Sequence, residues 1–182
     1  MSAGFGARLA AATADHGPLC VGIDPHPGLL ADWGLPDDAS GLREFGLRVV
    51  EAVGGRVAAV KPQSAFFERH GSRGVAALEE VLAAARAAGT LTSMDAKRGD
   101  IGSTMAAYAD AYLRDGSPRA ADALTVSPYL GFGSLQPAVD AALETGRGLF
   151  VLCLTSNPDG AEVQPAPRGA GAGGASVAAH GA

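Results

Sequence analysis

The stretch Ser93-Met-Asp-Ala-Lys-Arg-Gly-Asp-Ile-Gly-Ser-Thr104 places two acids, two bases and two glycines between an apolar run and a helix-like run. Charged residues at such a junction are costly to hold near a core unless they pair or take part in chemistry. Asp95 and Lys97 are two residues apart, so on a strand their side chains point to the same side. Asp100 follows at the point where Gly99 should turn the chain into a helix. Acid, base and acid at this spacing can hold a lysine ammonium between two carboxylates.

Apolar runs and helix-like runs alternate along the whole chain. Buried strands are expected at residues 19–23, 57–60, 91–94, 123–126 and 148–154. Amphipathic or alanine-rich helices are expected at residues 4–14, 42–53, 74–88, 101–114 and 134–144. Alternation of this kind predicts an α/β fold with a parallel sheet, and continuous apolar strands indicate that both faces of the sheet are covered.

The spacing of the strands favours a barrel over an open sheet. It is close to the ~31 residues per unit of a ~250-residue (β/α)8 barrel, the TIM barrel. Neither a dinucleotide-binding glycine fingerprint nor a P-loop is found. The sequence therefore predicts about the first five βα units of such a barrel.

Three local features complete this prediction. The two prolines of Asp24-Pro25-His26-Pro27 should prevent a regular continuation after the first strand, and a loop should follow through Trp33 to Ser40. Ser40 should cap the helix that begins at Leu42. Cys20 and Cys153 lie in apolar runs and are interpreted as small buried residues in a reducing compartment. The chain divides into a barrel part at 1–164 and a Gly/Ala/Pro-rich irregular tail at 165–182, in which residues 176–180 could start a short helix.

Composition narrows the class of protein. Hydrophobic residues make up 47% of the 182 residues and charged residues 18%, as in a globular domain. The net charge of −5 provides no basic surface for nucleic acid. No run approaches the ~20 apolar residues of a membrane span, and the first residues do not resemble a signal peptide. We therefore expect a cytoplasmic protein.

Functional side chains collect where the expected strands end. In a barrel, the carboxyl ends of the strands meet at one mouth, and catalytic residues come from several of them. The polar residues at these ends are Asp24, Lys61, Asp95, Lys97 and Ser127. An alternating set of acids and bases after three consecutive strands predicts a shared active site.

Some of these residues also have plainer interpretations. Asp24 could be a turn acid before proline, Asp100 could cap the helix at 101–114, and Lys61 could reach solvent. Arg98 is interpreted as a surface or structural residue. The histidines at 26, 70 and 180 lack partners at the spacing of metal ligands, so no metal site is expected. The acids could in principle hold Mg²⁺, but the lysine between them supplies the positive charge that a metal would bring.

The pattern Asp95-x-Lys97-x-x-Asp100-Ile101-x-x-Thr104 resembles the signature of the orotidine 5′-phosphate decarboxylase family. The fuller Asp-Ala-Lys-Arg-Gly-Asp-Ile-Gly-Ser-Thr resembles its branch found mainly in certain bacteria. Further segments at 22–25, 60–63, 126–131 and 154–158 also look like that branch, in its order. The resemblance covers roughly residues 3–164.

The resemblance implies decarboxylation of orotidylate to UMP, the last step in making the pyrimidine nucleotide, without metal or organic cofactor. It implies that Lys97 donates the proton and that Asp95 lies beside the departing carboxylate. Lys61 would link Asp95 to the ribose hydroxyls, Asp24 would accept a ribose hydrogen bond, and Ser127 would face the pyrimidine ring.

The resemblance also implies a homodimer in which Asp100 and Thr104 reach the partner's substrate, and it places Ile101 among the substrate-binding residues. The family's phosphate-binding loop, which carries an arginine, should follow residue 182. We therefore expect a C-terminally truncated chain.

Two alternatives remain at this stage. One is a sugar-phosphate aldolase or decarboxylase of the same barrel superfamily, which would need Mg²⁺ and would therefore be sensitive to chelators. The other is an inactive fragment.

Overall fold

Five parallel strands form the centre of the molecule in the computed structural model, which describes residues 3–166 and 176–180. The strands are β1 (Cys20–Ile23), β2 (Ala59–Pro62), β3 (Leu91–Arg98), β4 (Ala123–Val126) and β5 (Gly148–Val151). They lie in the order in which they occur in the chain, and every neighbouring pair is parallel. This is the strand order of consecutive units of a (β/α)8 barrel, so the predicted α/β fold class is confirmed.

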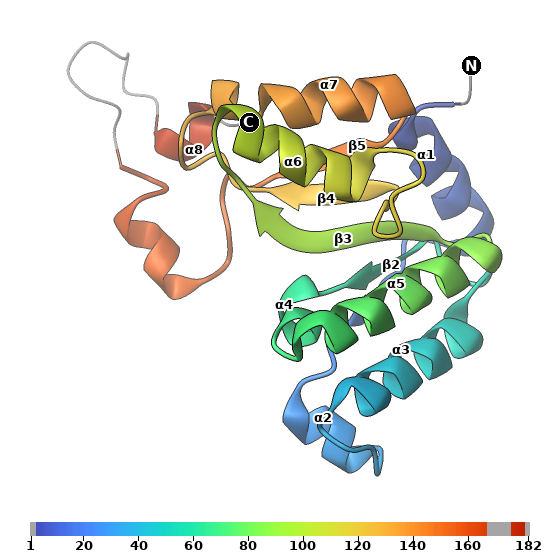
Figure 1. The fold of residues 1–182 in the computed structure, drawn as a ribbon. Coiled ribbons are helices and arrows are strands. Elements are labelled where there is room, and N and C mark those ends of the chain that lie inside the picture. The colour runs from blue at the N-terminus through green and yellow to red at the C-terminus, as the bar shows by residue number, and fades with distance from the viewer. Residues whose placement is uncertain (1–2, 167–175, 181–182) are drawn as a thin grey trace.

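Helices connect the strands and pack along the sheet. Figure 1 shows α3 beside α5 and α6 beside α7, with β3 between the two pairs. The α-helices are α1 (Phe5–His16), α2 (Pro27–Asp32), α3 (Ala39–Val53), α4 (Ser64–Glu68), α5 (Gly71–Ala87), α6 (Gly102–Leu113), α7 (Gln136–Thr145) and α8 (Val177–His180). Two short 3₁₀ segments, η1 (Phe132–Leu135) and η2 (Pro158–Glu162), follow β4 and β5.

The core fills the space between the sheet and these helices. It is continuous from Leu42 of α3 through Leu82 of α5 to Leu113 of α6, and all three side chains are fully buried. α3 and α5 approach closely at Gly46, where an added Cβ would lie 2.4 Å from a methyl group of Val81. Close packing through small residues fixes the strands and thereby the positions of the side chains at their ends.

The opposite face of the sheet is only partly covered, which differs from the sequence-based expectation. Helix α1 lies over part of this face, and a hollow of about 220 Å³ remains between Phe5, Leu9 and the strands. Cys20 of β1 is exposed and Cys153 is half-buried, so the prediction that both cysteines are buried was wrong. The apolar runs of β1 and β5 are continuous, but only one of their two faces meets the core.

Several boundaries also differ from the predictions. Two short helices were missed: α2 begins at Pro27, in place of an irregular segment, and α4 follows β2 directly. The N-cap of α3 is Asp38 rather than Ser40, because the Asp38 carboxylate accepts hydrogen bonds from the backbone N–H groups of Ser40 and Gly41. The fifth strand ends at Val151 rather than at residue 154.

The tail is described only in part. α8 agrees with the predicted short helix at 176–180, and residues 167–175 and 181–182 of the predicted irregular tail lie outside the described residues. None of the described helices has the length and apolar character that crossing a membrane requires.

Candidate active site

The carboxylate of Asp95 lies between two ammonium groups at the carboxyl end of the sheet. Lys61 Nζ lies 2.9 Å from Asp95 Oδ2, and Lys97 Nζ lies 2.5 Å from Asp95 Oδ1. Lys61 is on β2, and the other two residues are on β3. The sequence-based prediction that these strand ends bring acid and bases together is therefore confirmed for these three residues.

Asp95 is held in its ionised form. Its side chain is only 10% exposed, and this burial alone would raise its pKa. Hydrogen bonds from Lys97 and Lys61 and the positive charges of both lysines outweigh burial, so the pKa of Asp95 lies below its usual value. A buried charge of this kind persists only when it is paired and hydrogen-bonded, as it is here.

Lysine is used nowhere else in the chain. The sequence has 14 basic residues, and only Lys61 and Lys97 among them are lysines, the rest being arginines. An ammonium group carries transferable protons and shifts its pKa readily, whereas a guanidinium stays charged. The chain thus places both of its lysine ammonium groups beside a single carboxylate.

Two uncharged residues complete the environment of Asp95, and the sequence analysis missed both. Gln63 Nε2 donates to Asp95 Oδ2 at 3.0 Å, and Thr125 Oγ1 lies 3.1 Å from Asp95 Oδ1. Gln63 forms an isolated bridge with Asp95 just beyond β2. The sequence holds no signal that marks either of them, because a glutamine after a strand and a threonine within one are ordinary residues there.

Asp24 lies on the same face of the sheet as Lys61. Its carboxylate folds back over Gly22, where an added Cβ would lie 2.5 Å from Asp24 Oδ2. Gly22 is the lateral partner of Lys61 in the β1–β2 ladder, and lateral partners point to the same face. Asp24 is half-buried and has no ion pair among the described residues, so its carboxylate is available to accept hydrogen bonds.

Asp100 does not join this network. Its Oδ1 accepts a hydrogen bond from the backbone N–H of Ile101 at 2.8 Å, and Lys97 pairs with Asp95 alone. The prediction that the Lys97 ammonium lies between two carboxylates of the same chain was therefore wrong. The reason is local, because the chain turns away from the sheet at Gly99. Asp100 is also not the N-cap of α6, which is Ile101.

Ile101 and Thr104 are exposed beside Asp100, at the start of α6. The Ile101 side chain is 63% exposed, and Thr104 is also exposed. A large apolar side chain held in water at this position, next to a half-buried acid, is available for contact with another molecule.

Arg98 has the structural role that was expected, although it is not a surface residue. Its guanidinium pairs with Glu68 of α4, donates to the hydroxyl of Tyr112 at 3.2 Å, and lies over the rings of Tyr108 and Tyr112. These contacts connect the end of β3 to α4 and α6.

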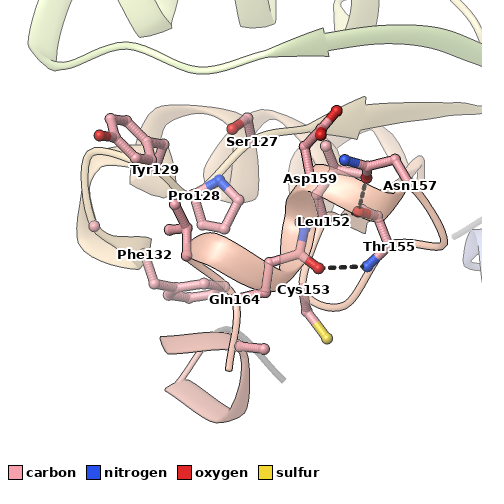
Figure 2. A pocket seen from close by; sticks show the side chains of 14 residues that line it. Ser127, Pro128, Tyr129, Phe132, Leu152, Cys153, Thr155, Asn157, Asp159 and Gln164 are labelled. Atoms are coloured by element: carbon pink, nitrogen blue, oxygen red, sulfur yellow. Dashed lines mark hydrogen bonds between the residues drawn. The ribbon is translucent and has the colours of Figure 1, made fainter. Parts of the chain in front are cut away.

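Ser127 opens onto a cavity of about 640 Å³ at the ends of β4 and β5 (Figure 2). Tyr129 and Phe132 line one side of it. On the other side, Gln164 accepts a hydrogen bond from the backbone N–H of Thr155 at 2.9 Å. The cavity is large enough for a small ligand and mixes aromatic with hydrogen-bonding groups, as such sites do.

The donor set around Asp95 favours a polar organic ligand over a metal ion. No group of three or more His, Cys, Asp or Glu side chains is placed to hold a metal among the residues that the structure describes. Both oxygens of Asp95 already accept hydrogen bonds from ammonium groups.

The chain is similar along most of its length to known proteins. Residues 17–179 match the model of the orotidine 5′-phosphate decarboxylase / HUMPS family. An orotidine 5′-phosphate decarboxylase from Streptomyces coelicolor is 66% identical over 177 residues, which are 97% of this chain and 64% of the relative. One from Nocardioides is 66% identical over 174 residues, with 96% and 64% covered. The chain thus spans slightly less than two thirds of the length of these relatives.

Solved structures share the fold. A Streptomyces avermitilis protein that carries the provisional name orotidine 5′-phosphate decarboxylase superposes with a TM-score of 0.90 at 69% identity, covering 92% of this chain and 59% of that one. The OMP decarboxylase of Leishmania donovani superposes with a TM-score of 0.75 at 37% identity, covering 91% and 60%. The resemblance to the family is confirmed, and the chain belongs to the orotidine 5′-phosphate decarboxylase / HUMPS family.

Proposed function

We propose that this chain carries the charged half of an active site that converts orotidine 5′-phosphate to UMP and CO₂ in pyrimidine nucleotide synthesis. The observation that carries the proposal is the Asp95 carboxylate held between Lys61 and Lys97 at the carboxyl end of the sheet. The names of the similar proteins support it, because those proteins are orotidine 5′-phosphate decarboxylases.

The chemistry suits an ammonium group beside a fixed negative charge. Loss of CO₂ breaks the bond between C6 and the carboxyl carbon and leaves the electron pair on C6, in the plane of the ring. The Lys97 ammonium stabilises this pair as it forms and then transfers a proton to C6. Asp95 lies beside the substrate carboxylate, where like charges disfavour the ground state.

Other residues bind the remainder of the nucleotide in this proposal. Lys61 links Asp95 to the ribose hydroxyls, and the free carboxylate of Asp24 accepts a hydrogen bond from the ribose. Ser127 faces the pyrimidine ring from the mouth of the cavity at the ends of β4 and β5.

A homodimer is part of the same proposal. The Asp100 carboxylate bonds to the backbone of Ile101 rather than to the Asp95 network, and Ile101 and Thr104 beside it are exposed. These three residues would contact the substrate of the partner subunit, and the cytoplasm would be the place of action, which suits two cysteines that form no disulfide.

A Mg²⁺-dependent sugar-phosphate reaction is the second candidate, because the family model includes the HUMPS branch. The ion pairs of Asp95 argue against it, since a metal would have to displace an ammonium group from an already paired carboxylate.

The test is the decay of orotidylate absorbance with the purified chain in the presence of EDTA. We expect decay that is unaffected by the chelator. The Lys97→Ala variant should lose about 10²- to 10⁴-fold in kcat, the usual contribution of a general acid. Its unfolding midpoint should change little, because the Lys97 side chain is nearly half exposed.

The matched control is Arg73→Ala, which removes an exposed cation from α5 and should leave the rate unchanged. Decay that EDTA abolishes would favour the second candidate. If the chain neither causes decay of orotidylate nor binds UMP, the proposal is contradicted.

A further inference from the structure

We propose that Thr125 is a positioning residue whose hydroxyl holds the main chain of β3 in the bulge that presents Lys97 to Asp95. The inference deepens the proposed function and rests on it only for its catalytic consequence. Thr125 is on β4, is 8% exposed, and belongs to no motif by which the site was recognised.

The contacts of this hydroxyl use all of its hydrogen-bonding capacity. Thr125 Oγ1 accepts from the backbone N–H of Ala96 at 3.0 Å and from that of Lys97 at 2.9 Å. It lies 3.1 Å from Asp95 Oδ1 and 3.4 Å from the carbonyl oxygen of Met94. A hydroxyl has two lone pairs and one proton, so the two N–H groups fill the lone pairs and the proton goes to the nearer acceptor, Asp95.

The sheet needs a hydrogen-bond acceptor opposite the irregular part of β3. Met94 pairs with Leu124 and Arg98 pairs with Val126, so three residues of β3, Asp95 to Lys97, lie opposite the single Thr125. Backbone N–H groups inside an irregularity of this size lose their ladder partners, and leaving them unpaired in a buried strand costs free energy. The Thr125 hydroxyl takes the place of the missing carbonyl oxygen for two of them.

The bulge also puts Lys97 in a conformation that needs support. Its φ is 49°, and it is the only residue other than glycine with a positive φ among the described residues. A side chain larger than glycine in this region carries strain that the surrounding structure must offset. The hydrogen bond from the Lys97 N–H to Thr125 supplies that support directly at the strained residue.

One hydroxyl therefore contacts the main chain of Lys97 and the carboxylate of Asp95. It fixes the proposed proton donor and its anionic neighbour relative to each other, although the Lys97 side chain is nearly half exposed and has a flexible stem. Groups held by buried hydrogen bonds in this way are preorganised for reaction. Valine at this position has the same shape without the hydroxyl, whereas serine keeps the hydroxyl.

The first test is hydrogen exchange with ¹⁵N-lysine protein, which has only two lysine amide signals because the chain has only two lysines. We expect the Lys97 amide to be protected in the wild type and in Thr125→Ser. In Thr125→Val it should exchange at least about tenfold faster, the effect of losing one hydrogen bond. The Lys61 amide, in the regular β1–β2 ladder, is the internal control.

An unprotected Lys97 amide in the wild type would overturn the proposal. Because this outcome is read on the wild type alone, the proposal can be tested even if the Thr125→Val protein fails to fold. Equal acceleration at Lys61 and Lys97 in that variant would also overturn it, because the hydroxyl would then serve overall stability alone.

The second test measures decarboxylation, provided that the wild type is active. Thr125→Val should lower kcat by about 10²-fold, the cost of misplacing a reacting group by about 1 Å, with KM nearly unchanged. Thr125→Ser should restore most of kcat. A Thr125→Val enzyme with wild-type kcat would overturn the inference. A wild type that neither decarboxylates orotidylate nor binds UMP, but whose Lys97 amide depends on Thr125, would contradict the proposed function and support the positioning role.

Discussion

Asp95 cannot move away from its position without breaking hydrogen bonds at both of its oxygens. Lys61 and Gln63 donate to Oδ2, and Lys97 and Thr125 donate to Oδ1. Lys61, Lys97 and Thr125 come from β2, β3 and β4, and Gln63 follows β2, so the carboxylate also connects three strands at one edge of the sheet. Its negative charge is fixed in place before any ligand arrives.

The depressed pKa of Asp95 predicts how stability depends on pH. Its pKa is lower in the folded chain than the value of 3.8 for an unperturbed aspartate, so the ionised form stabilises the fold. That contribution is fully present above about pH 4 and is lost as the pH falls through the lower, folded pKa. Urea unfolding between pH 7 and pH 2.5 should show stability that decreases on the acidic side.

The Asp95→Asn variant isolates this group. The difference in unfolding free energy between the wild type and this variant should change as the pH falls below about 4, and it should be constant from pH 5 to pH 7. Asp32→Asn is the control, because Asp32 is exposed and has no ion pair in the described part of the chain. A difference for Asp95→Asn that does not vary with pH would contradict the prediction.

The sequence was informative about the charged residues around Asp95 and silent about the uncharged residues that bond to it. Lys61, Asp95 and Lys97 could be placed together because parallel strands deliver their last residues to one edge. Thr125 and Gln63 could not be recognised, since a threonine in a strand and a glutamine after one are ordinary residues there. The positive φ of Lys97 arises from strand pairing, which a local pattern does not encode.

At the scale of elements, the ends of the helices depend on single side chains. Asp38 caps α3 through its Oδ1, which accepts from the backbone N–H groups of Ser40 and Gly41 at 2.8 and 3.0 Å and from the Ser40 hydroxyl at 2.6 Å. α3 packs on α5 and belongs to the core, so fraying of its first turn reaches buried residues such as Leu42.

Removing this cap should destabilise the chain measurably. Asp38→Ala leaves the N–H groups of Ser40 and Gly41 without a partner, and we expect Tm to fall by about 2–4 °C, as for a lost N-cap in a chain of this size. Ser40→Ala is the matched control and should have a smaller effect, since it leaves both N–H bonds to Asp38 in place. A larger effect of Ser40→Ala would show that Ser40 is the cap, as the sequence suggested.

Long elements were predictable, and short ones were not. The helix at 42–53 has an apolar residue at every turn on one side, and it appears within α3 with only its start extended. α2 and α4 have six and five residues, too few for a periodic pattern. α2 is stabilised at its start by a side-chain cap, because His26 Nδ1 accepts a hydrogen bond from the backbone N–H of Leu29 at 3.2 Å.

At the scale of the whole molecule, α1 connects the two ends of the strand series. Arg8 of α1 pairs with Asp122 before β4 and donates to the carbonyl oxygen of Gly146 before β5 at 3.2 Å. Phe5 packs edge-on against Phe150 of β5, with ring centroids 5.9 Å apart. Asp122 also accepts from the backbone N–H of Thr92 at 2.9 Å, so one carboxylate joins α1 to two strands.

Breaking this connection should weaken the whole fold. Arg8→Ala removes one partly buried ion pair and one hydrogen bond, and we expect a loss of about 1–2 kcal/mol in unfolding free energy, measured by urea denaturation at pH 7. Arg56→Ala is the control, because Arg56 is exposed and has no ion pair in the described residues. Equal midpoints for Arg8→Ala and the wild type would show that α1 is held by its apolar contacts alone.

The sequential strand order has a consequence for how the chain folds. Each strand pairs with the next one along the chain, so closing each strand pair spans one βα unit and costs less loop-closure entropy than a contact between distant parts of the chain. The contacts of Arg8 span 114 and 138 residues and can be made only after the sheet exists. We infer that α1 docks last and that its release starts unfolding. Loss of the Arg8 contacts would then act chiefly on the rate at which the native chain opens, and hardly on the rate at which it forms.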